Sequence, residues 1–280
     1  MESKQNPFSF YDFLGYLTPG AIFLYSFILV APHIQLFEDI SEFLNNHHNI
    51  DKVELYIPFV LSAYVIGHIM NFLSSVTVEI YSIWSSGYPS KYLLKVPVSK
   101  YFEIEKPKRI KMTARVLLLI ILAPVTTLDF ILGYLLKLRE VYAKNLDPLL
   151  ISLIQYKIVA LLKENKVPAD KALVSQTDNY FRFIYHYCVE NAPNHLPKMQ
   201  NYVALYGFLR TLTFLSVLGF WTLMTFMCTN KIELMKGFGY LVFVSLCSYI
   251  LFMAFTKFYR RFSLEAFMAL TAVYPKKQLN

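Results

Sequence analysis

The chain has 280 residues, of which 56% are hydrophobic and 17% aromatic, while only 16% are charged. A soluble domain usually carries about a quarter of charged residues, so this composition excludes an ordinary soluble protein. The formal net charge of +8 favours anionic partners such as lipid headgroups. The three cysteines (Cys188, Cys228 and Cys247) form no CxxC or zinc-type spacing, which excludes a disulfide framework and a CxxC redox motif.

Four runs of 20 or more residues contain no Asp, Glu, Lys or Arg, and they span 13–37, 55–78, 211–230 and 237–256. At ~1.5 Å per helical residue, each run can cross a ~30 Å hydrocarbon core. A fifth run, 116–136, is long enough, but it contains Asp129 in its middle and Pro124, which breaks a helix interior at a cost of about 3 kcal/mol unless neighbours compensate.

The distribution of charge decides the topology that we expect. The loop 38–54 holds five carboxylates against one lysine and is predicted to be external, whereas 80–210 holds 18 Lys and Arg against 9 Asp and Glu and is predicted to be cytosolic. Counting 116–136 as a span would export ten of these positive charges. We therefore predict four spans with both termini inside, and we place 116–136 as an apolar helix in a cytosolic domain or against the bilayer surface.

The predicted fold is an all-α integral membrane protein with a helical cytosolic domain between its second and third transmembrane helices. The parts are an N-terminal hairpin at 1–84, a basic helical domain at 85–208, a C-terminal hairpin at 209–256 and a cytosolic amphipathic tail at 257–280. The tail suits a helix that leaves the membrane and lies on it or docks on the cytosolic domain, and a basic flank with a frayed end is the alternative.

Helices are expected to dominate the cytosolic domain. The segment 148–165 begins with Pro at a first helical position and carries apolar residues at helical spacing, and 170–191 repeats this pattern. The Pro- and Lys-rich stretch 95–112 is the one extended candidate that the pattern indicates.

A polar stripe runs along the second predicted span. A helix turns about 100° per residue, so spacings of 4, 3, 4, 4 and 3 place the six side chains within a sector roughly 80° wide. The stripe consists of Tyr64, His68, Asn71, Ser75, Glu79 and Ser82. Such a stripe can line a pore or gate, or it can hold helices together through hydrogen bonds, and catalysis is a weaker third interpretation. Glu79 lies near the cytosolic end, where a charged side chain reaches the interface easily.

A basic run follows the first predicted hairpin. Its members are Lys106, Lys108, Arg109, Lys111 and Arg115. If the chain is helical from Lys108 onward, Lys108, Lys111 and Arg115 share one face, which suits phosphates. The same residues could simply meet anionic lipid, at about 1 kcal/mol per charge near the surface. Both alternatives stay open: a lipid contact, and a site for a nucleotide or an oligonucleotide.

Catalytic patterns give little support for an enzyme. The sequence has no G-x-S-x-G, Walker A or G-x-G-x-x-G pattern. His47 and His48 are adjacent in the predicted external loop, so they lack the i, i+4 geometry that brings two imidazoles to one metal. We therefore expect no enzymatic activity, no cofactor and no metal site.

The sequences YDFLGYLTPG, AYVIGHIMNFLSS, NYVALYGFLRTLTF and KFYRRFSLEAF resemble those of four-span bacterial membrane proteins. The layout is similar to membrane effectors of bacterial anti-phage systems, and to the Hailong effector in particular, a channel controlled by single-stranded deoxyadenylate oligomers from a companion nucleotidyltransferase-like protein. This resemblance implies a bacterial inner-membrane protein with a nucleotide-type signal and a cytosolic partner of that kind.

The expected function is an oligomeric ion channel or pore, gated through the basic cytosolic domain by a nucleotide or oligonucleotide. Four helices pack into a solid bundle, so an aqueous path needs several copies of the chain. The alternative is a membrane scaffold or sensor subunit that recruits a cytosolic partner, and an enzyme that acts on lipid ranks third.

Overall fold

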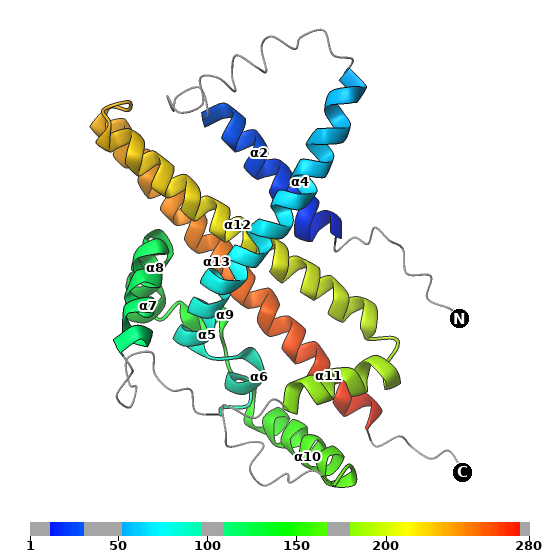
Figure 1. The fold of residues 1–280 in the computed structure, drawn as a ribbon. Coiled ribbons are helices and arrows are strands. Elements are labelled where there is room, and N and C mark those ends of the chain that lie inside the picture. The colour runs from blue at the N-terminus through cyan, green and yellow to red at the C-terminus, as the bar shows by residue number, and fades with distance from the viewer. Residues whose placement is uncertain (1–11, 31–51, 97–108, 167–179, 275–280) are drawn as a thin grey trace.

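The structure, a computed structural model, describes residues 12–30, 52–96, 109–166 and 180–274 (Figure 1). Within these ranges the chain is helical and contains no strand. The N-terminal part comprises η1 (Phe13–Leu17), α2 (Thr18–Val30), α4 (Lys52–Ser74), η4 (Ser75–Glu79), α5 (Ile80–Ser86) and α6 (Pro89–Tyr92). The middle comprises α7 (Arg109–Ile121), α8 (Ala123–Leu128), η5 (Asp129–Leu135), α9 (Arg139–Tyr142), α10 (Pro148–Glu164) and α11 (Tyr180–Asn191). Two long helices, α12 (Leu196–Cys228) and α13 (Leu234–Val273), complete the described chain. The elements η1, η4 and η5 are π-helical.

Among the described residues, four helical segments are long and apolar enough to cross a membrane, as the sequence predicted, and a bent helix pair at 112–135 would be a fifth if it counts as one span. Four such helices indicate a multi-pass membrane protein. They are Phe13–Val30, Tyr56–Tyr92, Leu196–Cys228 and Leu234–Val273. At ~1.5 Å per residue, the 33 residues of α12 and the 40 residues of α13 measure about 50 and 60 Å. Both helices are therefore much longer than a ~30 Å hydrocarbon core requires.

The long helices form an antiparallel hairpin that α4 crosses (Figure 1). The pair η1–α2 packs against α4, and the far ends of the two hairpins diverge. A core at this crossing, called here the crossing core, takes buried side chains from α4, η4, α5, α7, α8, α12 and α13. Its largest fully buried members are Tyr249, Phe252, Phe255 and Leu122. Burial of such a side chain stabilises a fold by about 1.5–3 kcal/mol, so the crossing is a firm junction.

A second core lies at the other end of the molecule. We call this region the base, and it consists of α6, α10, α11, the first part of α12 and the last part of α13 (Figure 1). The helix α10 follows its predicted bounds closely, because the Asp147 carboxylate accepts a hydrogen bond from the Leu149 amide at 2.9 Å and Pro148 occupies the first turn. Residues 262–270 of α13 supply Phe262, Ala266, Phe267, Ala269 and Leu270 to this basal core.

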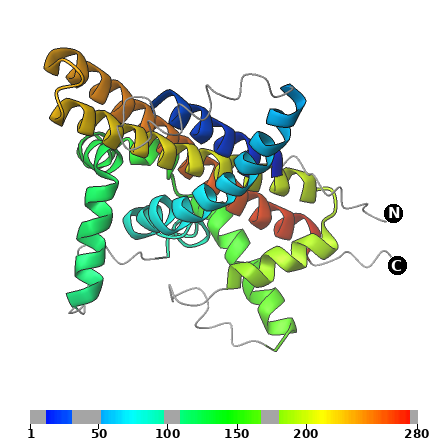
Figure 2. The ribbon, with the colours of Figure 1, turned by 45° about the horizontal axis from the view of Figure 1, so that its top comes forward.

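The run 116–136 is not the continuous helix that we predicted. It breaks at Leu122, and the segments Met112–Ile121 and Ala123–Leu135 meet at 89°. Figure 2 shows α7 standing away from the crossing helices, while α8 packs on α13. Leu118, Leu122 and Val125 belong to the crossing core, so this pair packs with the span-length helices and not in the basal core.

Other expectations fall partly outside the described residues. The external loop and much of the extended candidate 95–112 lie there, as do residues 31–37 of the first predicted span and 170–179 of a predicted helix. Residues 109–112 are helical in α7, contrary to the extended prediction for that end.

Candidate functional site

The polar stripe of α4 begins where this helix crosses η1–α2. The crossing is so close that a Cβ atom on Gly67 would meet the backbone of Tyr16, and one on Gly20 would meet the backbone of Ala63. Small residues allow helices in membranes to approach in this way. The close approach places the first stripe residues against η1.

Three rings fill the space beside this crossing. The Tyr16 ring stacks on His68 with centroids 3.7 Å apart and an interplanar angle of 17°. Tyr64 meets His68 edge-on at 4.7 Å. His68 therefore contacts two tyrosines of its own chain.

Further along the stripe, Arg210 of α12 binds several groups of the α4–η4 segment. Its Nη1 forms an ion pair with Glu79, and its Nη2 donates to the Asn71 side-chain oxygen. Its Nε donates to the Ser74 hydroxyl at 3.1 Å, and that hydroxyl also lies 3.3 Å from Thr211 Oγ1. Arg210 and Glu79 keep only 10% and 21% of their side chains exposed. We call these groups the Arg210 cluster, and it ties the two hairpins together.

The structure thus divides the predicted stripe. Tyr64 and His68 face Tyr16, while Asn71 and Glu79 face Arg210. Ser75 lies apart and its hydroxyl donates to the Phe72 carbonyl at 2.7 Å. Within one protomer these are packing contacts, and pore lining by the same residues in an oligomer stays a prediction.

A second charged cluster surrounds Asp129, whose side chain is fully buried at the start of η5. Its carboxylate accepts hydrogen bonds from Tyr81 at 2.7 Å and from Tyr142 at 2.9 Å. Arg139 donates through Nε at 3.1 Å and forms an ion pair through Nη2. Another nitrogen of Arg139 donates to the Ser85 carbonyl at 3.2 Å. This Asp129 cluster connects η5, α5 and α9.

The surroundings raise the pKa of two members of the Asp129 cluster, Arg139 and Tyr142. Burial alone would lower the pKa of Arg139, but its hydrogen bond and ion pair with Asp129 raise that pKa above its ordinary value. Burial, followed by the negative charge of Asp129, raises the pKa of Tyr142 far above its ordinary value. At neutral pH the guanidinium is therefore charged and the Tyr142 phenol is neutral. Gly133 permits the close packing, because a Cβ at this position would collide with the Asp129 carboxylate.

The break between α7 and α8 also has side-chain partners. The Trp221 indole of α12 donates to the Ile121 carbonyl at 2.8 Å, and the Thr126 hydroxyl donates to the Leu119 carbonyl at 3.1 Å. A helix break frees backbone carbonyls, and membrane proteins tolerate a break where neighbouring groups satisfy them. The bent pair therefore has the features of a broken span or a re-entrant element.

The basic run is described only in part. Lys106 and Lys108 lie outside the described residues, and α7 begins at Arg109. Lys111 is also in this helix, while the Arg115 guanidinium lies 5.0 Å from the centre of the Trp84 ring.

Sequence reasoning missed several partners of the stripe and of Asp129. It singled out neither Ser74 of the Arg210 cluster nor Tyr16, which stacks on His68, and it treated Arg210 only as the edge of a span. Asp129 did carry a signal, since it is a carboxylate in the middle of an apolar run. Intramembrane ionisable residues usually pair or mark a pathway, and this rule could have singled out Asp129.

Chemically, both clusters hold helices together through an ion pair and hydrogen bonds. Among the described residues, no group of three or more His, Cys, Asp or Glu side chains could hold a metal ion.

Comparison of the chain with protein-family models, curated proteins and solved structures gave no match.

Proposed function

We propose that this chain is one subunit of an oligomeric membrane channel or pore whose opening is controlled by a ligand from the side of the membrane on which the base lies. The observation that carries the proposal is the bent pair Met112–Ile121 and Ala123–Leu135, which is apolar enough for a membrane. Its second arm, α8 and η5, contains the buried Asp129, which forms an ion pair with Arg139. Broken helices and buried charged residues within a membrane are costly, and they commonly mark ion or substrate pathways.

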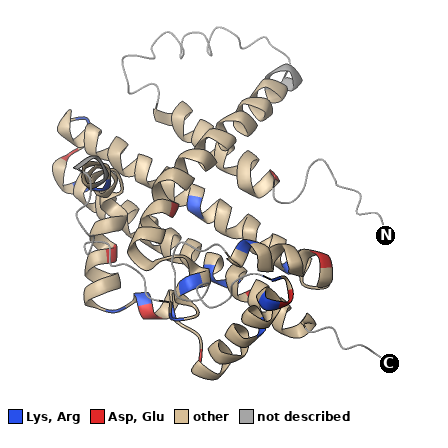
Figure 3. Cartoon of the chain, turned by 60° about the horizontal axis from the view of Figure 1, so that its bottom comes forward, with Lys and Arg blue, Asp and Glu red and all other residues tan. Residues whose placement is uncertain are grey.

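The charge distribution supports a cytosolic base. Figure 3 shows that Lys and Arg gather toward the base, whereas α2 and the outer parts of the long helices carry few charges. An excess of Lys and Arg is typical of the cytoplasmic side. We propose a bacterial inner-membrane location with both termini in the cytosol.

An aqueous path requires more than one copy of the chain. The crossing core fills the junction between the two hairpins with side chains. Large apolar side chains on the outer part of α13, among them Met235, Phe238 and Phe243, are exposed and are available to lipid or to another subunit. The proposed path therefore lies between subunits, as in bundles whose own interior is solid.

The proposed gating ligand is an anion, either a nucleotide or a single-stranded oligonucleotide, bound at the basic run. The helical start of α7 brings Arg109, Lys111 and Arg115 onto one short helix. The resemblance to anti-phage effectors supplies the oligonucleotide, the nucleotidyltransferase-like partner and the defence role. Anionic lipid is the competing partner for the same charges.

Charge reversal at the basic run tests the ligand. Changing Lys108, Lys111 and Arg115 together to Glu should abolish binding of a short deoxyadenylate oligomer to purified protein and leave assembly intact. The control reverses three lysines elsewhere, Lys137, Lys144 and Lys163, which are exposed. Oligomer binding that is equally tight in the charge-reversed variant, or that does not weaken as salt rises, would remove this site.

A scaffold or sensor subunit is the second candidate, and the contacts of the polar stripe favour it. His68 and Asn71 each contact groups of the same chain, as packing residues do. Cysteine accessibility separates the candidates. In an assembled channel lined by the stripe, a cysteine at Ser75 should react with a polar reagent faster than one at Leu73. Equal reactivity of the two cysteines, together with no ion flux through liposomes under any tested ligand, would contradict the channel and favour the scaffold.

A further inference from the structure

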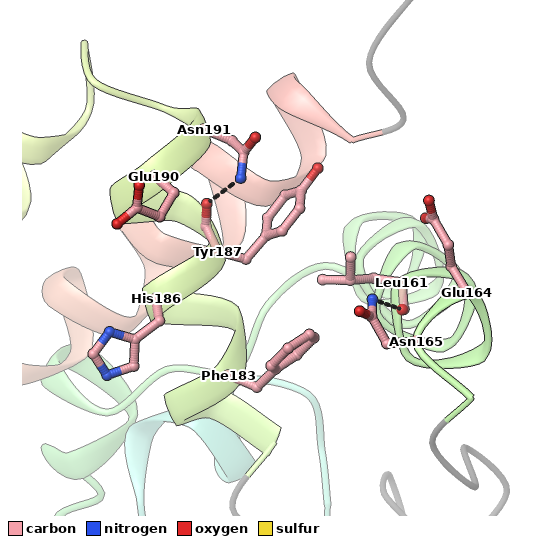
Figure 4. A pocket seen from close by; sticks show the side chains of 8 residues that line it. All are labelled: Leu161, Glu164, Asn165, Phe183, His186, Tyr187, Glu190 and Asn191. Carbon is pink, nitrogen blue, oxygen red and sulfur yellow. Dashed lines mark hydrogen bonds between the residues drawn. The ribbon is translucent and has the colours of Figure 1, made fainter.

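The base contains an open cavity of about 410 Å³ between the end of α10 and α11. Figure 4 shows the rings of Phe183 and Tyr187 pointing from α11 toward Leu161 and Asn165 on the α10 side. Neither the channel proposal nor the basic run uses these residues. The volume falls within the usual range for small-molecule sites, roughly 300–1,000 Å³.

The charges of the cavity lining select the ligand. Glu164 and Glu190 contribute carboxylates, and the lining residues that the structure describes include neither Lys nor Arg. This is the opposite of what a phosphate requires, although the chain as a whole is basic. The lining therefore disfavours the nucleotide proposed for the basic run and favours a cation.

The hydrogen-bonding groups of the cavity lining also fit a cation. The amide nitrogen of Asn165 donates to the Leu161 carbonyl, and that of Asn191 donates to the Tyr187 carbonyl, both at 2.9 Å. Each bond uses one of the two N–H groups of its amide and orients the amide on its own helix, and the amide oxygens can act as acceptors. An ammonium group can donate up to three hydrogen bonds to amide oxygens and carboxylates.

Part of the cavity wall is held in place by the C-terminal end of the described chain. The Tyr274 hydroxyl donates to Glu164 Oε2 at 2.7 Å, and the Tyr187 and Tyr274 rings meet edge-on with centroids 5.9 Å apart. The hydrogen bond to Glu164 raises the pKa of Tyr274 to about 12, so this phenol stays neutral at physiological pH. Tyr274 thus supports the Tyr187 ring of the cavity wall, and ring faces attract cations.

From these observations we infer that the cavity between α10 and α11 binds a small organic cation with primary ammonium groups, of the polyamine class. One ammonium lies against the rings of Phe183 and Tyr187, and Glu190 with the amide oxygens accepts its hydrogen bonds. This site is independent of the proposed channel and requires no anionic ligand.

Calorimetric titration of the detergent-purified full chain with spermidine tests the inference. We expect saturable binding at one site per chain. Phe183→Leu and Glu190→Gln should each weaken the affinity by about five- to tenfold, since each removes one cation–π or charge contact. Both side chains are exposed, so the fold should persist. The matched controls are Tyr156→Leu on an exposed part of α10 and Glu140→Gln on α9, and they should leave the affinity unchanged.

The inference is wrong if spermidine shows no saturable binding at millimolar concentration, or if its affinity is the same in the cavity variants and in the controls. Adenosine monophosphate provides the counter-test, because its binding with the same dependence on Phe183 and Glu190 would show that the charge argument is wrong. Nα-acetyl-lysine amide distinguishes the source of the ammonium. Tighter binding of this compound than of spermidine would contradict a free polyamine and indicate a lysine side chain of a protein.

Discussion

Removal of Arg210 should destabilise the junction between the two hairpins. This side chain is only 10% exposed and donates to Glu79, Asn71 and Ser74. Loss of one partner of a buried pair typically costs about 3–5 kcal/mol, whereas an average hydrogen bond between membrane helices contributes only ~0.6 kcal/mol. Because Arg210 carries a charge and binds three partners, we expect Arg210→Met to lower the free energy of unfolding by about 3 kcal/mol.

A double-mutant cycle isolates the ion pair. Glu79→Gln keeps a hydrogen-bond acceptor and should cost about 1–2 kcal/mol. The double variant should be little worse than Arg210→Met alone, because the carboxylate left without its cation is then absent. Unfolding in mixed micelles can be followed by tryptophan fluorescence, since Trp84 and Trp221 are the chain's two tryptophans. Lys257→Met, at an exposed position, serves as the control and should change stability by less than about 0.5 kcal/mol. The coupling would be refuted if the double variant lost as much free energy of unfolding as the sum of the losses in Arg210→Met and Glu79→Gln.

Three further predictions concern the bent pair and the topology. Gly133→Val should lower the melting temperature of the purified protein, because the new side chain displaces the Asp129 carboxylate, and an unchanged temperature would contradict the packing described. Trp221→Phe should speed amide exchange around the α7–α8 break in hydrogen–deuterium measurements, because the Ile121 carbonyl loses its donor; equal exchange in both proteins would show that this bond is unimportant. A membrane-impermeant maleimide should label the exposed Cys228 on intact cells but not the buried Cys188, whose thiol pKa burial raises to about 12. Labelling of Cys228 only in inside-out vesicles would reverse the proposed topology.

The spans were predictable because hydropathy depends on composition, and composition is visible in the sequence. The ends of the helices could not be predicted in the same way. The charges at Lys257, Arg260 and Arg261 end the apolar run at Thr256, yet α13 continues to Val273 because its last part packs into the basal core. Hydropathy marks where a membrane-compatible segment ends, but it does not show where a helix ends.

The stripe was predictable as a face of α4, but its partners were not. A period of 3.6 places Asn71, Ser75 and Glu79 together, whereas the side chains that meet Arg210 are Asn71, Ser74 and Glu79. The π-helical turn at 75–79 explains the change, because a wider turn shifts the register by one residue. The partner Arg210 lies more than 130 residues away along the chain, and no local pattern identifies it.

The Asp129 cluster shows the same limit. The sequence shows a carboxylate and a proline in an apolar run, which indicates that a straight span is unfavourable there. It does not show that Tyr81 and Arg139 converge on that carboxylate, because they come from elements on either side of α7 and α8. Only the fold brings these groups together.

Ion current through planar bilayers that contain the purified wild-type protein tests the proposed channel most directly. With short single-stranded deoxyadenylate oligomers on the side of the base, we predict discrete current steps that are absent without ligand. Asp129→Asn should change the opening probability, because it weakens the ion pair that fastens the bent pair to α9. A silent bilayer with correctly assembled wild-type protein, under nucleotides and oligonucleotides alike, would contradict the channel and leave the scaffold as the function.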